Sequence, residues 1–222
     1  MNRRGLKREL RRFLEEGDFT KLARFIQGCG PSSLIGPLLS LLLADKEVVR
    51  WRAITTLGMV VESLANSNME RARVFMRRCM WMLTDESGGV GWGIPEVMGE
   101  VMSRVERVAV EFSSILISYV LEEEGRPDNF LEYTPLRRGA WWGIARLAQG
   151  IGSQVLPWVP LLKDSLGREE DPFILAHGLL LFRELYIPIG EERLLHDHRR
   201  VLIYWNLSLK EVTISSLARG SD

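Results

Sequence analysis

The sequence predicts an all-α protein in which about four antiparallel helix pairs stack into a solenoid, with a small β-hairpin near the C-terminal end. Three observations predict this class. A tryptophan followed seven positions later by a small residue recurs along the chain, and each copy follows another amphipathic segment. After Pro188 the helical periodicity gives way to β-branched and aromatic residues. A repeat of this kind determines the fold of every copy at once.

The repeat is visible in three short stretches: "WRAITTLG" (Trp51 to Gly58), "WGIPEVMG" (Trp92 to Gly99) and "WWGIARLA" (Trp141 to Ala148). A weaker fourth copy begins at Asp171 and lacks the tryptophan. Seven residues make about two turns of α-helix, so the tryptophan and the small residue share one face. We expect the small residue to admit a neighbouring helix and the tryptophan to fill the wider gap, in a buried seam.

Each copy follows another amphipathic segment, which predicts the first helix of its pair. These segments are Ser33 to Ala44, Met69 to Thr84, Val105 to Glu122 and Ser153 to Leu166. Helix pairs repeating every roughly 40 residues are typical of an α-solenoid, in which each pair buries its apolar face against its neighbours.

Within "LADKEVVRWRAITTLGMV" (residues 43–60) the sequence resembles a HEAT repeat of the short, phycobilisome-lyase-like kind. That armadillo-type pattern has an aspartate at the turn, then Val-Arg, an alanine and Leu-Gly, matched here by Asp45, Val49, Arg50, Ala53, Leu57 and Gly58. The resemblance extends over about residues 33–186, more loosely in the later copies. It implies an α-solenoid fold and, since HEAT arrays serve mostly as binding scaffolds, a scaffold or adaptor role.

The chain divides into three segments of one structural domain. Residues 1–32 read as an N-terminal cap of two helices, the second beginning after Asp18 and ending at Gly28 or Gly30. Residues 33–187 hold the repeats. Residues 188–222 contain a short helix and then a hairpin over residues 200–218, with Asn206 in the middle, that we expect to pack over the last helix pair.

Composition favours a cytoplasmic protein without a membrane segment. Lys plus Arg equals Asp plus Glu at 29 each, which excludes the overall positive charge of most nucleic-acid binders. Two cysteines are too few for a disulfide framework. The N-terminal basic stretch lacks the apolar region of a signal peptide, and the longest apolar run, Leu34 to Ala44, is too short to span a bilayer.

The stretch "TDESGGVGWGIPE" (residues 84–96) has two interpretations. Its glycines permit a tight reversal, and Pro95 and Glu96 suit the first turn of a helix, so it reads as a joint between helices. Alternatively, its backbone N–H groups could cradle an anion, although Asp85 and Glu86 would repel a phosphate. We prefer the joint.

The titratable residues give little sign of catalysis or metal binding. Glu96 and Glu100 lie four apart on one helix face, where acid–base chemistry is conceivable but a solvated face is commoner. His196 and His198 read as surface residues. His177, which stands where the fourth copy would carry its tryptophan, reads as a packed imidazole. We expect no catalytic residue, metal or cofactor.

The preferred function is binding of a protein or peptide in a concave groove lined by the second helices. Nucleic-acid binding, with or without base excision, is the alternative, since arginines on these helices together with tryptophans could grip a phosphate backbone and stack a base. The sequence leaves the oligomeric state open. The candidate groove residues are Asp85, Glu86, Trp92, Glu96, Glu100, Arg137, Arg138 and Trp142.

Overall fold

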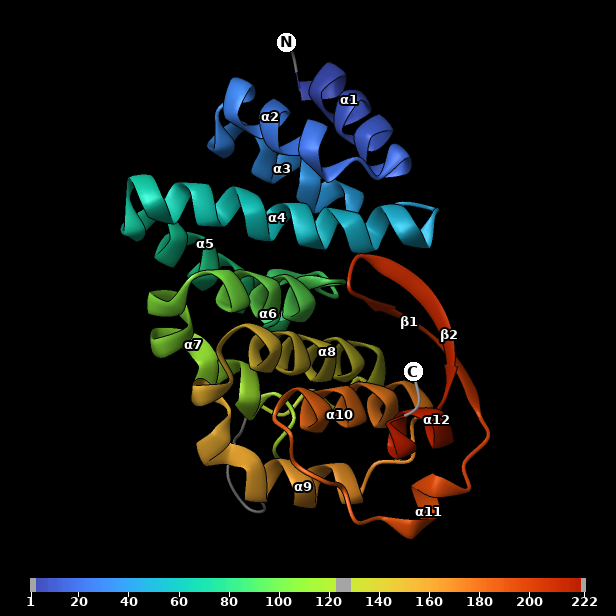
Figure 1. Cartoon of the computed structure of the whole chain (residues 1–222). Coiled ribbons are helices and arrows are strands. Elements are labelled where there is room, and N and C mark those ends of the chain that lie inside the picture. Colours follow the sequence, from blue (N-terminus) through green and yellow to red (C-terminus); the bar gives the residue numbers. More distant parts are fainter. Residues whose placement is uncertain (1–2, 123–128, 221–222) are drawn as a thin grey trace.

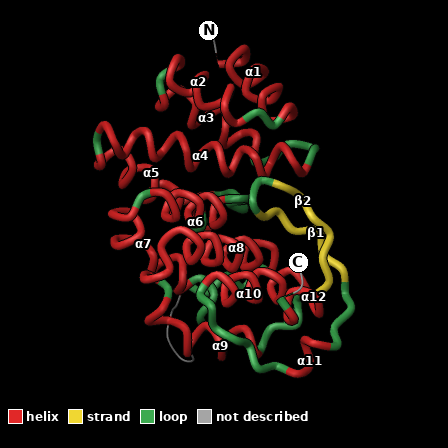
Figure 2. Tube along the Cα trace, viewed as in Figure 1, coloured by secondary structure: helices red, strands yellow, loops and turns green. Residues whose placement is uncertain are grey.

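In a computed structural model the chain is mostly helical, and a two-stranded hairpin lies along one side (Figures 1 and 2). The structure describes residues 3–122 and 129–220. The α-helices are α1 (Arg3–Glu16), α2 (Phe19–Cys29), α3 (Pro31–Leu41), α4 (Glu47–Ser67), α5 (Met69–Met82), α6 (Ile94–Arg104), α7 (Glu106–Ser118), α8 (Thr134–Ile151), α9 (Val159–Gly167), α10 (Pro172–Glu184), α11 (Glu192–Leu195) and α12 (Ile214–Arg219). Short 3-10 helices span Asp85–Ser87, Gly152–Gln154 and Leu156–Trp158. The strands are β1 (Arg200–Trp205) and β2 (Ser208–Thr213).

Helices α4, α6, α8 and α10 follow one another down the molecule in a row (Figure 1), and each contacts the next. They are the helices that the repeat predicted as the second of each pair. Helices α3, α5, α7 and α9 precede them along the chain and pack against them. The predicted alternation of helices is therefore confirmed, including the position of the glycine-rich stretch as the joint between α5 and α6.

Small residues bring the helices of this row close together, as the repeat predicted. A Cβ atom added to Gly99 on α6 would lie 2.2 Å from the Cα of Gly143 on α8, so the two backbones touch. A Cβ on Gly58 of α4 would lie 2.6 Å from Cγ of Glu100 on α6. Only residues without a side chain allow these approaches.

The tryptophans do not all lie in a buried seam. Trp141 and Trp142 are buried, and Trp51 is half-buried, but Trp92 is 42% exposed. The expectation for Trp92 was wrong because its copy of the motif starts in the loop: Gly93, with φ of 74°, forms the N-cap, and α6 begins only at Ile94.

Two helices, α1 and α2, form at the N-terminal end of the described chain. Leu6, Leu10 and Leu14 form the buried face of α1, which packs on α3 and α4. The Asp18 side chain accepts a hydrogen bond of 2.9 Å from the backbone N–H of Lys21 and starts α2. Helix α2 ends at Cys29, where Gly30 adopts a positive φ of 77°.

The hairpin is antiparallel and turns at Asn206 and Leu207, which both have positive φ. Two successive residues of this kind are typical of the tight turn that matches strand twist. The sequence predicted strand structure through residue 218, which was wrong beyond Thr213. There a capping box between Thr213 and Ser216 starts α12 instead.

The hairpin reaches much further than the last helix pair (Figure 1). Tyr204 of β1 stacks on Trp51 of α4, with ring centroids 5.3 Å apart and an interplanar angle of 7°. The indole N–H of Trp142 on α8 donates a 2.8 Å hydrogen bond to the carbonyl of Tyr204. The hairpin therefore covers part of the surface that the second helices were expected to leave open. In the described part of the chain, no helix has the length and apolar character needed to cross a membrane.

Candidate functional site

The structure gathers three of the eight predicted groove residues in one place. Trp92, Glu96 and Arg138 line a pocket of about 430 Å³ at one end of the helix row, which we call the aromatic pocket. The first turns of α4, α6, α8 and α10 form most of its wall, and β1 adds one residue. The full lining is Leu42, Leu43, Ala44, Glu47, Arg50, Trp51, Ile54, Trp92, Gly93, Glu96, Pro135, Arg138, Gly139, Phe173, His177 and Leu202.

Three aromatic side chains from three parts of the chain line this pocket. Trp92 meets Tyr133 edge to face, with ring centroids 5.7 Å apart, and keeps much of its surface exposed. Trp51 is held against Tyr204 of the hairpin. Phe173 lies under the guanidinium of Arg138, whose Cζ is 4.5 Å from the ring centroid. The pocket is of the size and character of small-ligand sites, which are mostly apolar with a few polar groups.

Glu96 places a carboxyl group in this apolar surrounding. It lies in the first turn of α6, beside Gly139 of α8: a Cβ added to Gly139 would fall 2.3 Å from Oε2 of Glu96. The residue as a whole is half-buried, but Oε2 is fully buried and has no hydrogen-bond partner among the described residues. Desolvation raises the pKa of Glu96 to about 7, because burial disfavours the charged form.

His177 of α10 contributes the second buried polar group. Its Nδ1 lies 3.1 Å from the backbone carbonyl of Arg138, so Nδ1 carries the hydrogen and donates. Its Nε2 is then an acceptor, and it has no partner among the described residues. Burial lowers the pKa of His177 to about 4, so the ring is neutral near pH 7. The packed imidazole predicted from the sequence is confirmed, and it also lines the pocket.

The two arginines of the pocket have partners already. Arg138 forms a paired contact with Asp171, at 3.0 Å from Nε to Oδ1 and 2.6 Å from Nη2 to Oδ2. Asp171 in turn caps α10 by accepting from the N–H of Phe173. Arg50 donates to the carbonyl of Ala44 at 2.9 Å. These arginines brace the wall of the pocket.

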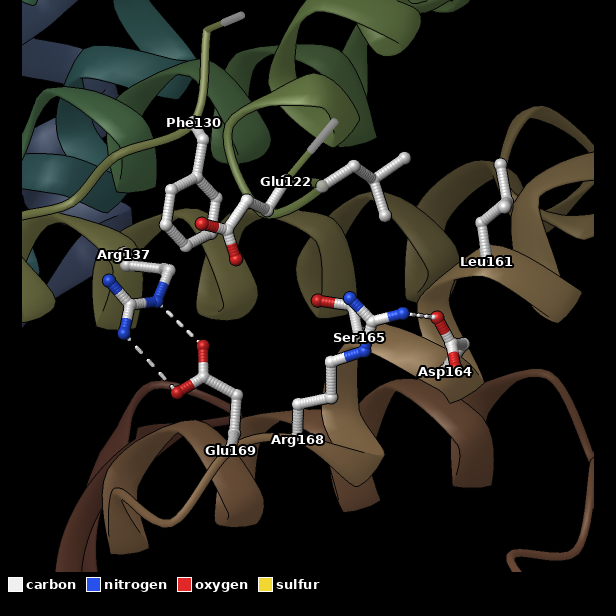
Figure 3. A pocket seen from close by; sticks show the side chains of 9 residues that line it. Glu122, Phe130, Arg137, Leu161, Asp164, Ser165, Arg168 and Glu169 are labelled. Carbon is white, nitrogen blue, oxygen red and sulfur yellow. Dashed lines mark hydrogen bonds and ion pairs between the residues drawn. The ribbon is translucent and has the colours of Figure 1, made fainter. Parts of the chain in front are cut away.

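Arg137, the neighbour of Arg138, lies in a different and smaller pocket of about 230 Å³ (Figure 3). Figure 3 shows its guanidinium meeting the carboxylate of Glu169, at 2.6 Å from Nε to Oε1. The other arginine there, Arg168, pairs with Asp164. Both arginines of this second pocket are already paired with carboxylates. The aromatic pocket, in contrast, contains two polar atoms that have no hydrogen-bond partner among the described residues.

Glu100 and Trp142 are structural. Trp142 is covered by the hairpin and only 1% exposed. Glu100 is also buried, at 1%, and its carboxylate contacts Arg104 at 2.6 Å and Arg146 at 2.7 Å. The interpretation of Glu100 as part of a solvated face was therefore wrong, because the hairpin and α8 enclose that side of α6.

The remaining predicted residues lie in the joint. Glu86 is exposed in the short helix Asp85–Ser87 and is not among the residues lining the aromatic pocket, whereas the side chain of Asp85 lies outside the part of the chain that the structure describes. In the described residues no group of three or more His, Cys, Asp or Glu side chains is placed to hold a metal ion.

Sequence reasoning missed Trp51 and His177 as pocket residues. Both occupy the tryptophan position of their repeat copies, which we interpreted as core. That equivalence was the available signal, since corresponding positions of stacked helices end up side by side. No protein-family model, curated protein or solved structure matches this chain.

Proposed function

We propose that the protein is an adaptor: a HEAT-like solenoid whose second helices hold a segment of a protein partner, with the aromatic pocket as the main recognition site. The observation that carries this proposal is the pocket itself. It combines an exposed tryptophan, further aromatic walls and two buried polar atoms that have no hydrogen-bond partner among residues 3–122 and 129–220. Tryptophan is among the residues that most often dominate binding energy in protein interfaces.

The hairpin limits the surface on which a partner can bind. It covers Trp142 and the middle of the helix row, so the ends of α6, α8 and α10 at the aromatic pocket are the part of the predicted groove that stays open. A pocket of about 430 Å³ accommodates one large side chain better than a whole helix. We therefore expect a short segment anchored by one side chain.

The arginine pattern gives the nucleic-acid alternative little support. The second-helix arginines bond to protein groups: Arg52 to the carbonyls of Leu14 and Glu15, Arg104 and Arg146 to Glu100, Arg137 to Glu169, and Arg138 to Asp171. A phosphate backbone would have to compete with these partners for the same donors.

Selection of peptide ligands tests the proposal. Linear peptides selected from a random library on the wild-type protein should bind Trp92→Ala at least about tenfold more weakly, because truncation removes an aromatic wall of the pocket. Trp81→Ala is the matched control, since Trp81 is 53% exposed but lies on α5, away from the pocket. Affinity is measured by fluorescence anisotropy of labelled peptides.

Selected peptides that bind Trp92→Ala as well as wild type, or that depend on Trp81 instead, would overturn the proposal. A duplex DNA gel shift on the same samples addresses the alternative. Tight binding that weakens steeply as salt rises would favour nucleic acid over a peptide.

A further inference from the structure

We propose that the aromatic pocket binds a donor-only cation: the ammonium of a lysine or the guanidinium of an arginine in the partner segment. This inference rests on the proposed function and names the chemistry of the anchoring side chain. Three features of the pocket favour such a cation: the two unpartnered buried atoms, the charges around them and the aromatic walls.

When Glu96 is ionised, both unpartnered polar atoms at this pocket are hydrogen-bond acceptors. Ionised Glu96 has only acceptor oxygens, and His177 presents Nε2 as an acceptor because its Nδ1 donates to the carbonyl of Arg138. A buried acceptor without a donor is costly. A ligand that complements the pair must therefore bring donors, and a lysine ammonium or an arginine guanidinium brings donors only.

The residues that the structure describes do not supply these donors. Arg138 turns its guanidinium to Asp171 and Phe173, and Arg50 bonds to the carbonyl of Ala44. No hydrogen bond joins Glu96 to His177 in the described structure. The carboxyl group of Glu96 is held beside Gly139, where any side chain larger than hydrogen would displace it.

The charges around the pocket also favour a cation. The pocket and its immediate surroundings hold three carboxylates (Glu47, Glu96 and Asp171) and two guanidinium groups (Arg50 and Arg138). When Glu96 is ionised, the set carries one net negative charge, which a single lysine or arginine neutralises. The positive end of α6 works in the opposite direction, but Glu96 itself lies in that first turn and offsets it.

The walls suit the rest of such a side chain. Trp92 exposes its ring, and a cation within about 6 Å of an indole face is attracted by the ring electrons. Leu43 and Leu202, which are 68% and 41% exposed, line the pocket as well and offer apolar contact to a methylene stem.

Small probes test the inference directly. At matched ionic strength, n-pentylamine and n-pentylguanidine should bind at least about tenfold more tightly than pentan-1-ol and pentanoate, with millimolar Kd values as expected for so few atoms. Calorimetry near pH 6 in two buffers of different ionisation enthalpy should show proton release on amine binding, because the cation favours ionised Glu96.

Two variants and one control make the test specific. Glu96→Gln should weaken amine binding at least about tenfold and abolish the proton release, while leaving pentan-1-ol binding unchanged. Gly139→Ala should weaken amine binding as well, because its methyl group occupies the place of the carboxylate. Glu106→Gln, an exposed acid in the first turn of α7, should have no effect.

Pentanol or pentanoate binding as tightly as the amine, or an unchanged amine affinity in both Glu96→Gln and Gly139→Ala, would overturn the inference. The outcome is separable from failure of the proposed function. If selected peptides depend on Trp92 but tolerate replacement of every lysine and arginine by norleucine and citrulline, the adaptor function stands and the cation is wrong. If they do not depend on Trp92, the adaptor function fails.

Discussion

Glu96 and His177 line the same pocket, and burial shifts their pKa values in opposite directions. Burial disfavours charge, so the pKa of the carboxyl rises to about 7 and the pKa of the imidazole falls to about 4. The folded protein therefore keeps both groups neutral over a range of pH in which the unfolded chain ionises them. This makes pH a sensitive probe of the pocket.

The sign of each effect follows from proton linkage. Between about pH 4.5 and 7, folded Glu96 holds a proton that the unfolded chain has lost, so the free energy of unfolding falls as pH rises. Between about pH 4 and 6.5, unfolded His177 binds a proton that the folded ring does not, so the free energy of unfolding rises with pH. In wild type the two trends oppose each other between about pH 4.5 and 6.5.

Glu96→Gln should remove the opposing contribution of Glu96, so that the pH dependence of stability due to His177 becomes measurable. We expect the variant to match wild type near pH 4.5 and to be more stable by about 2 kcal/mol near pH 8, a figure reduced for the partial exposure of the residue. Its free energy of unfolding should now rise with pH between about 4 and 6.5. Urea denaturation at four pH values measures this, with Glu106→Gln as control. A pH-independent difference between Glu96→Gln and wild type would contradict the assignment of the shift to Glu96.

At the scale of elements, the close packing of α6 against α8 depends on direct contacts between their backbones. Gly99 and Gly143 place α6 and α8 in direct contact, and Gly150 of α8 lies similarly close to Ser103 of α6. A methyl group at Gly99 meets backbone rather than a flexible side chain, so the helices would have to separate.

Gly99→Ala should therefore destabilise the protein by about 1–3 kcal/mol or more. Gly28→Ala is the matched control: Gly28 also lies in a helix, but a Cβ there meets nothing within 4 Å. The control should be neutral or slightly stabilising, because alanine favours helix. Thermal and urea denaturation of the two variants give the comparison, and an equal effect of both substitutions would rule out the close approach of α6 to α8.

The repeat pattern located these contacts but misjudged the aromatic positions. It fixed the small residues correctly because seven residues along a helix return to the same face. It failed at Trp92 because Gly93 ends the loop there and the helix begins one residue later. The separate strand pattern of the C-terminal segment failed beyond Thr213, where a local capping box starts a helix.

At the scale of the whole molecule, an ion network centred on the buried Glu100 ties the helix row together beneath the hairpin. Glu100 of α6 contacts Arg146 of α8 and Arg104, and Arg104 also reaches Glu62 of α4 at 3.4 Å. The hairpin turn closes over this side through Asn206, which accepts from Gln149. The network thus joins three helices of the row to the C-terminal segment.

Glu100→Ala should destabilise the protein by about 3–5 kcal/mol, because it leaves two guanidinium groups without their buried partner. Glu111→Ala removes the carboxylate from an exposed pair with Arg73 and should change stability little. Chemical denaturation measures both variants, and hydrogen exchange of β1 and β2 reports whether the hairpin loosens. Equal small losses of stability in both variants would mean that the ion network around Glu100 does not hold the molecule together.

The sequence by itself determined the mostly helical structure, the two N-terminal helices, the hairpin turn and the close approaches at Gly58 and Gly99, because these depend on periodicity and local backbone preference. It also named Trp92, Glu96 and Arg138, but as members of a long groove. Only the tertiary structure decided that these three meet His177 and Trp51 in one pocket, and that the hairpin covers Trp142 and Glu100. The physical reason is that these contacts join residues far apart in sequence, so that no local pattern encodes them.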